Sequence, residues 1–173
     1  MLEAAVLVTF PFCMVFAAVS DMVSMTIANR VSVLLVAAFA ALAPLTGMPW
    51  PEIGMHLAAG AAVLAVTFTL FAIGGMGGGD AKLMAATSVW FGFSLGLLSY
   101  LVIAALLGGI LTLALLIFRS SSLSMLVGNN LFLRHFANEK TGVPYGIALG
   151  LGGLISYGQT PLMQWAMARL AAL

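Results

Sequence analysis

Two aspartates stand out in a chain that is otherwise almost free of charge. Asp80 directly follows the glycine-rich run 74–79, and Asp21 lies upstream at the end of another apolar stretch. An acid near the bilayer interior costs roughly 2.5–3.5 kcal/mol on insertion scales, so such residues are candidates for function. If the two carboxylates lie within a few ångströms of each other, repulsion and burial leave one protonated and the other ionised near neutral pH. Such a pair can hydrolyse a peptide bond, because the ionised acid takes a proton from water while the protonated acid polarises the scissile carbonyl.

The glycines before Asp80 have a physical role in this chemistry. Gly77 and Gly79 carry no Cβ, so they would let the backbone of an extended substrate approach the carboxylate closely. Irregular backbone at membrane depth is tolerated only where protein or water satisfies its polar groups, as in an active-site cavity. The spacing alone leaves a second interpretation open. Residues 74–79, which are too rich in glycine for a stable helix interior, would then be a flexible loop, and Asp80 would be the N-cap of a helix that begins near Ala81.

The composition indicates what kind of protein positions these acids. Hydrophobic residues make up 63% of the 173 residues and charged residues only 6%, which predicts an all-α polytopic membrane protein. The length allows about six transmembrane helices of ~20 residues in a single transmembrane domain over 1–173, with no room for a separate soluble domain. The net charge of +1 argues against a nucleic-acid partner. With Cys13 as its one cysteine and no His-Glu-x-x-His pattern, the sequence predicts no disulfide, no metal site and no cofactor.

The apolar runs define the expected helices. The run 83–118 is too long for one span and must fold back once, between Gly92 and Tyr100, and a glycine-rich break precedes this fourth span. Thr160 and Pro161 are expected to interrupt the chain before an apolar tail. The segment 123–136, which mixes apolar and polar residues, is predicted to be an interfacial helix or a loop. The other predicted spans are 2–19, 27–45, 55–73 and 143–157.

Alternation of these spans places most of the basic residues on one side. Arg169 falls on the opposite side, and the positive-inside rule makes the shared, basic side cytoplasmic. The same alternation puts Asp21 and Asp80 together at cytoplasmic ends of spans, and it puts both chain termini outside. The residues that share the cytoplasmic side are Arg30, Lys82, Arg119, Arg134 and Lys140.

Three short motifs, in this order along the chain, resemble the signatures of one family, the type IV prepilin peptidases, which are bacterial GxGD-type membrane aspartyl proteases. The resemblance implies that Asp21 and Asp80 are the catalytic pair. It also implies a prepilin substrate whose short basic leader is removed at the cytoplasmic face of the bacterial inner membrane. The motifs are Ser20-Asp21 with Ile27-Ala28-Asn29-Arg30, Gly77-Gly78-Gly79-Asp80 with Ala81-Lys82-Leu83, and Val143-Pro144-Tyr145-Gly146-Ile147-Ala148.

The chain departs from the family pattern in two respects. Ala28 stands where members often carry proline, so the helix entry after Asp21 is expected to be less rigid. Larger relatives carry a cytoplasmic insertion with Cys-x-x-Cys pairs and a methyltransferase activity, and this chain has neither the cysteines nor the length. It is therefore similar to the short peptidases that serve Flp-type pili, and no methyltransferase domain is expected.

Further residues are predicted to shape the site or bind substrate. Lys82 marks the cytoplasmic boundary or, alternatively, favours the ionised form of Asp80. Asn29 caps a helix or hydrogen-bonds near Asp21, or packs in the core. The resemblance adds Pro144, Tyr145 and Gly146 to this group. Two other function classes remain open: a small proton-coupled permease, although relay acids would be expected nearer the midplane, and a noncatalytic assembly subunit.

Overall fold

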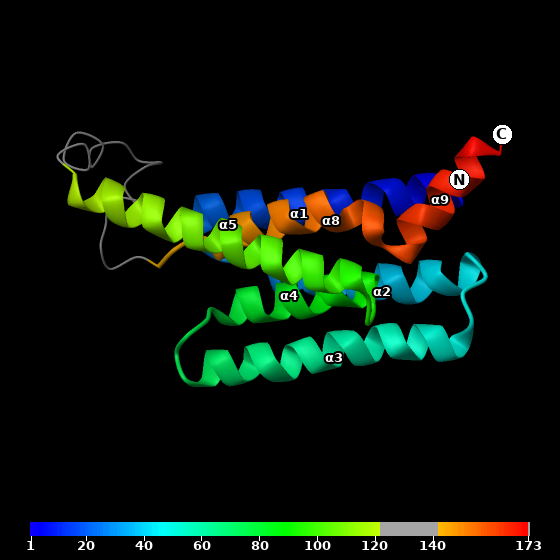
Figure 1. The fold of residues 1–173 in the computed structure, drawn as a ribbon, viewed down its shortest axis with the longest axis horizontal. Coiled ribbons are helices and arrows are strands. Elements are labelled where there is room, and N and C mark those ends of the chain that lie inside the picture. Colours follow the sequence, from blue (N-terminus) through cyan, green and yellow to red (C-terminus); the bar gives the residue numbers. More distant parts are fainter. Residues whose placement is uncertain (122–141, 173) are drawn as a thin grey trace.

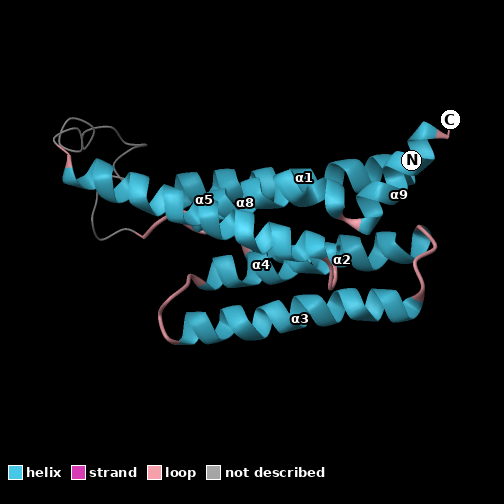
Figure 2. Cartoon of the chain, in the orientation of Figure 1, coloured by secondary structure: helices cyan, strands magenta, loops and turns pink. Residues whose placement is uncertain are grey.

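The computed structural model describes residues 1–121 and 142–172, and every regular element in them is a helix (Figures 1 and 2). The all-α prediction is therefore confirmed for this part of the chain, whereas the predicted interfacial segment 123–136 lies outside it. The elements are α1 (Leu2–Ser24), α2 (Asn29–Leu45), α3 (Trp50–Ala72), α4 (Gly78–Phe91), α5 (Leu95–Ser120), α8 (Tyr145–Ser156), the 3-10 turn η1 (Tyr157–Gln159) and α9 (Pro161–Ala171).

The helices fall into a long and a short group. Among the described residues, α1, α3 and α5 are long and apolar enough to cross a membrane, and α2 is a shorter apolar helix of 17 residues. Helix α4 has 14 residues and α8 has 12, which corresponds to about 21 Å and 18 Å at 1.5 Å per residue. Both are shorter than the ~30 Å hydrocarbon core. Three of the described helices thus have the length and apolar composition of membrane spans, while the expected number of about six spans stays a prediction.

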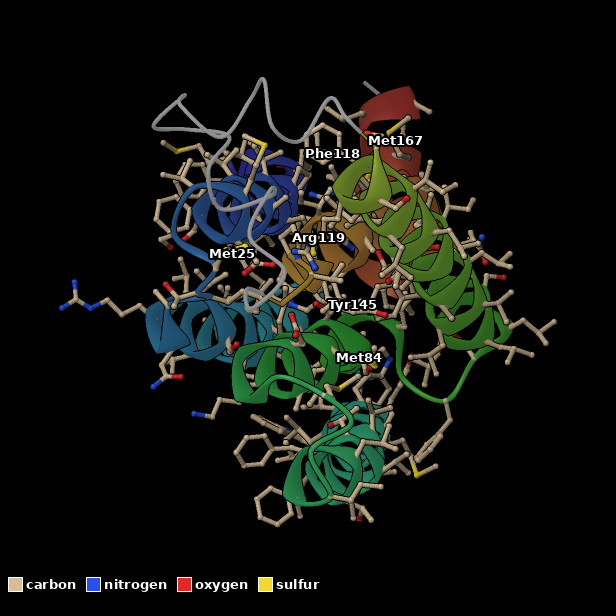
Figure 3. The ribbon with its side chains drawn as sticks, turned by 90° about the vertical axis from the view of Figure 1, so that its left-hand side faces the viewer. Met25, Met84, Phe118, Arg119, Tyr145 and Met167 are labelled. Carbon is tan, nitrogen blue, oxygen red and sulfur yellow. The ribbon has the colours of Figure 1, made fainter. Side chains whose placement is uncertain are left out.

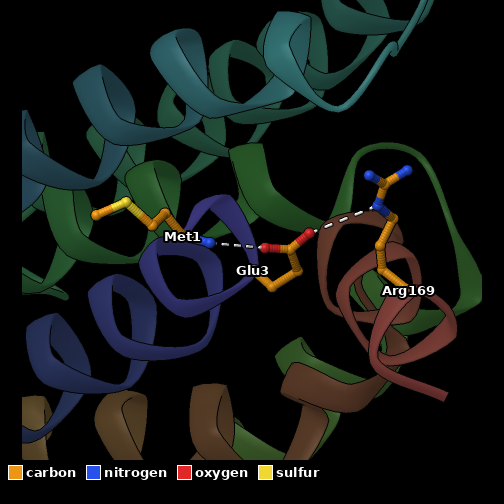
Figure 4. Close-up of polar contacts among 3 residues, drawn as sticks. All are labelled: Met1, Glu3 and Arg169. Atoms are coloured by element: carbon orange, nitrogen blue, oxygen red, sulfur yellow. Dashed lines mark hydrogen bonds and ion pairs between the residues drawn. The ribbon is translucent and has the colours of Figure 1, made fainter. Parts of the chain in front are cut away.

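The two ends of the bundle differ in what they carry. The N- and C-termini lie together at one end, and the glycine-rich connection between α3 and α4 lies at the other (Figure 1). At the terminal end, the Glu3 carboxylate of α1 accepts a hydrogen bond of 3.1 Å from the Met1 amine and lies 3.5 Å from Arg169 Nε of α9 (Figure 4). This arrangement agrees with the alternation predicted from the sequence, which placed both termini on one side.

The apolar run 83–118 folds back where the sequence predicted. Helix α4 ends at Phe91 and α5 begins at Leu95, within the expected interval. Gly92 adopts a φ of 61°, and a Cβ there would stand 2.8 Å from His56 Nε2, so the turn requires glycine at this position. The Ser94 hydroxyl caps α5 by accepting a 3.2 Å bond from the Leu97 N–H.

Helix α4 lies in the middle of the bundle and packs against α2, α3 and α8. Two hydrogen bonds to neighbouring helices hold the C-terminal half of α4. The buried Trp90 indole donates to the Leu35 carbonyl of α2 at 3.0 Å, and His56 Nδ1 of α3 donates to the Val89 carbonyl at 2.8 Å. Because buried polar groups must be paired in an apolar setting, these bonds define the position of α4 along its axis. They thereby define where its first turn, which carries Asp80, ends up.

Small residues let α8 fit between α1 and α5. A Cβ on Gly150 would stand 2.7 Å from the Met14 carbonyl oxygen, and one on Gly153 would stand 2.7 Å from Met14 Sδ. On the other side, a Cβ on Gly152 would stand 3.1 Å from Ala104 of α5. Glycines allow membrane helices to approach this closely and to gain packing contacts. The first turn of α8 is thereby brought against the end of α1 that carries Asp21.

Candidate active site

Asp21 and Asp80 lie on one cavity of about 250 Å³ at the end of the bundle opposite the termini. The two acids are close enough for their charges to interact. Asp21 is only 5% exposed, so its carboxylate faces this cavity and not the surrounding membrane. Residues 59 positions apart in the chain are therefore brought together as the sequence predicted. The remaining lining comes from Met25, Thr26, Ile27, Gly77, Gly78 and Gly79.

Asp21 is held by the N-terminus of another helix. It belongs to the last turn of α1, which extends to Ser24 and not only to residue 19 as predicted. Its Oδ2 accepts a buried hydrogen bond of 2.7 Å from the backbone N–H of Gly146, the second residue of α8. The first N–H groups of a helix have no partner within the helix and favour an anion. A Cβ on Gly146 would stand 2.7 Å from Asp21 Cβ, so only glycine permits this contact without a shift.

Asp80 is the third residue of α4, so the alternative interpretation of Asp80 as an N-cap is wrong. The helix begins at Gly78, the N-cap is Gly77, and the backbone of Gly77 is a hydrogen-bond partner of the Asp80 carboxylate. An acid in the first turn that returns to the N-cap backbone is one half of a capping box. Gly78 and Gly79 are thus helical, contrary to the prediction of a loop over 74–79. Placing two glycines in a helix costs backbone entropy, and the negative charge of Asp80 near the helix N-terminus partly offsets this cost.

A short loop between α1 and α2 forms the wall facing α4. Met25 has a left-handed φ of 53°, and its N–H donates to the Asp21 carbonyl at 2.8 Å. The Ser20 hydroxyl donates to the Thr26 carbonyl at 3.0 Å, and the Ser24 hydroxyl lies 2.8 Å from Thr26 Oγ1. These bonds hold the loop against the end of α1. A Cβ on Gly79 would stand 3.2 Å from Ile27 Cβ, so the first turn of α4 packs closely on the same loop.

Sequence reasoning did not single out Met25 and Thr26 as lining residues. The hydroxyl residues Ser20, Ser24 and Thr26 were a usable signal, because such side chains commonly bond to nearby backbone at helix ends. Nothing in the sequence indicated that Met25 adopts a left-handed backbone, because this conformation is unusual for a residue other than glycine, asparagine or aspartate. Figure 3 looks onto this end of the bundle and labels Met25 there.

Lys82 and Asn29 contact each other outside the cavity. Lys82 Nζ donates to Asn29 Oδ1 at 3.0 Å, across 53 residues of sequence, and both side chains are exposed. They line one end of an apolar groove of about 720 Å³ between α2, α3 and α4. In the described structure, Asn29 therefore bonds to Lys82 and not to Asp21, and its side chain does not cap α2.

The three residues at the start of α8 divide into two groups. Gly146 contacts Asp21 directly, as described above. Pro144 is the N-cap of α8, and the Tyr145 hydroxyl lies 3.0 Å from Thr112 Oγ1 of α5. Neither Pro144 nor Tyr145 is among the described residues that line the cavity. The sequence grouped all three as site-shaping residues, and the structure brings only Gly146 to the carboxylates.

The fold and this site define a class: a helical membrane protein with two carboxylates on one cavity at one end of the bundle. The sequence model of the type IV leader peptidase family matches residues 8–113, more than half of the chain, and the match includes both aspartates. The chain belongs to the type IV leader peptidase family, and is therefore a peptidase whose family implies a prepilin substrate. No curated protein and no solved structure matches it. The prediction of a prepilin peptidase is confirmed at the level of the family.

Proposed function

We propose that this protein is an aspartyl endopeptidase that removes the leader of type IV pilin-like precursors, of the Flp type, with Asp21 and Asp80 as its catalytic residues. The observation that carries the proposal is that acids from two different helices, α1 and α4, line one cavity. The described helices pack around a shared core, which supports a single transmembrane peptidase domain. Lipid covers the apolar outer faces, and the catalytic step uses no cofactor.

The two acids divide the work of peptide hydrolysis. One carboxylate is ionised and takes a proton from a water molecule, whose oxygen attacks the scissile carbonyl carbon. The other is protonated and donates its proton to the carbonyl oxygen, so that a neutral tetrahedral intermediate forms without a covalent bond to the enzyme. The acid that received the water proton then passes it to the leaving nitrogen as the C–N bond breaks. The hydroxyl proton on the former carbonyl oxygen returns to the second acid as the C=O bond is restored.

The glycine-rich side of the cavity supports access by an extended peptide. This side of the cavity is formed by backbone alone, because its lining residues Gly77, Gly78 and Gly79 have no side chain. A substrate backbone can therefore approach the Asp80 carboxylate more closely than any larger residue would permit. In this proposal Gly77 and Gly79 shape the site, and Gly146 holds Asp21. Lys82, Asn29, Pro144 and Tyr145 act from outside the cavity.

The charge distribution supports a cytoplasmic active site in the bacterial inner membrane. Arg119 is in the last turn of α5, and Arg30 is in the first turn of α2, which follows directly on the loop that lines the cavity. Arg169 lies at the opposite end, with the termini. Basic residues are retained on the cytoplasmic side of membrane proteins. A leader that is cleaved before export would then meet Asp21 and Asp80 from the cytoplasm.

The test is co-expression with candidate prepilins from the same genome, with conversion of precursor to mature protein measured on a gel. Asp21→Asn and Asp80→Asn are nearly isosteric but cannot exchange protons as a carboxyl group does. Each should lower processing by roughly 100-fold to 10,000-fold, as expected for loss of a general acid or base. Glu52→Gln is the matched control, because Glu52 is an exposed acid in the first turn of α3. Processing near the wild-type level by either aspartate variant would exclude the proposed pair.

A further inference from the structure

We propose that Tyr145 is a positioning residue that ties the amide holding Asp21 to helix α5. The inference rests on the proposed function, since it concerns how Asp21 is kept in place for catalysis. Tyr145 does not line the cavity within the described structure, so its effect must pass through its neighbour Gly146. The contacts of Tyr145, Thr112 and Gly108 carry the argument.

The hydroxyl of Tyr145 is held by a directional bond. Its oxygen lies 3.0 Å from Thr112 Oγ1, and the Thr112 hydroxyl also lies 2.7 Å from the Gly108 carbonyl oxygen. A threonine hydroxyl has a single proton, and the Gly108 carbonyl can only accept. The proton of Thr112 is therefore used on Gly108, and Tyr145 must be the donor to Thr112. This chain of two bonds fixes the outer end of the tyrosine ring on α5.

The ring itself rests on Gly108. A Cβ placed on Gly108 would stand 2.6 Å from Tyr145 Cε1 and 3.0 Å from Cδ1. Such distances leave no room for a methyl group, so the ring uses the space that the glycine leaves open. The next residue, Gly109, has nothing within 4 Å of its Cβ position. Of these two adjacent glycines in α5, only Gly108 lies against the Tyr145 ring.

A second contact ties the same segment to α5. The Arg119 guanidinium donates to the Gly142 carbonyl at 3.0 Å, three residues before Tyr145. The start of α8 is therefore joined to α5 at two points, and Gly146 immediately follows the second one. Its N–H lies 2.7 Å from Asp21 Oδ2 in a buried setting, where a hydrogen bond to a charged group contributes more than one between neutral groups.

Loss of this support should affect the chemical step and not substrate binding. A catalytic group displaced by about 1 Å can lose roughly 100-fold in rate. Tyr145 is outside the cavity, so its removal leaves the walls that face the substrate unchanged. The expected signature is a lower kcat at an unchanged KM.

The first experiment compares Gly108→Ala with Gly109→Ala in the purified full-length protein, using a prepilin that the wild type cleaves. Both changes remove one glycine from the same helix, but only the methyl group at Gly108 collides with Tyr145. We expect Gly108→Ala to lower kcat about tenfold with KM within about twofold, and Gly109→Ala to match the wild type. Equal kcat values for the two variants, or a change in KM alone, would overturn the role of Tyr145.

A double-mutant cycle decides the matter if Gly108→Ala does not fold. Tyr145→Phe and Thr112→Val each remove one partner of the hydroxyl contact, and each should lower kcat about threefold, with no further loss when they are combined. Losses that multiply would show that the two residues act separately and would overturn the inference. These experiments do not test the proposed function itself, because failure of the proposed function would instead appear as a fully active Asp21→Asn variant.

Discussion

Replacing Gly77 with alanine should displace the Asp80 carboxylate while leaving both acids in the chain. A Cβ on Gly77 would stand 2.6 Å from Asp80 Oδ2 and 3.5 Å from its Cγ. The obstacle is therefore the end of the Asp80 side chain itself. Since Asp80 is in the first turn of α4 and Gly77 is its N-cap, the backbone positions of both residues are defined by the same turn.

The size of the effect follows from that distance. Carbon and oxygen atoms come no closer than about 3.3 Å without strong repulsion, so the carboxylate must move by about 0.7 Å. A displacement of about 1 Å can cost 100-fold in rate, so kcat should fall by roughly tenfold to 100-fold. Alanine is also a poorer N-cap than glycine, which should lower the free energy of unfolding by about 1 kcal/mol or less.

The assay measures leader cleavage under steady-state conditions, together with the thermal midpoint in detergent. Gly75→Ala is the matched control in the same connection, because its Cβ would make an ordinary contact of 3.4 Å with the Leu70 carbonyl. Gly75→Ala should retain the wild-type kcat. If Gly77→Ala and Gly75→Ala cleave at the same rate, the Asp80 carboxylate is not held where the structure places it, and the reasoning is refuted.

Three further predictions test the rest of the site. Gly79→Val should lower kcat by at least tenfold, because even a Cβ at this position would stand 3.2 Å from Ile27 Cβ and valine adds two more methyl groups. Gly79→Ala should lower kcat less. Equal losses of kcat for the two variants in a cleavage assay would contradict the close packing. Met25→Gly should raise the free energy of unfolding by about 0.5–1 kcal/mol, because glycine adopts a φ of 53° without the Cβ penalty; a denaturation curve showing destabilisation would contradict this. With Cys13→Ser as background, single cysteines at Ser24 and Lys82, two exposed positions close in sequence to the acids, should be labelled from the cytoplasmic side by a membrane-impermeant reagent. Labelling from opposite faces would separate the two acids and rule out a shared site.

The sequence by itself indicated the family of the protein and predicted that Asp21 and Asp80 lie together at one end of the helices. Hydrophobic runs and the helix-breaking glycines are local properties, so they indicated helices, the turn after Gly92 and the interruption at Thr160 and Pro161 before any contact was known. Alternation of the runs then placed Asp21 and Asp80 at one end, because each span reverses the direction of the chain. The family resemblance rested on the same short motifs, and the family match includes both acids.

The tertiary structure decided which partners each acid meets. The bond from Gly146 to Asp21 joins residues 125 apart, and it exists because the glycines of α8 allow close packing on Met14. The pairing of Lys82 with Asn29 likewise depends on how α4 is rotated against α2. Rotation and axial shift of packed helices follow from side-chain shapes on several elements at once, and hydropathy along one segment carries no record of them. The start of α4 at Gly78 was decided in the same way, because Asp80 turns back to the Gly77 backbone and allows two glycines to be helical.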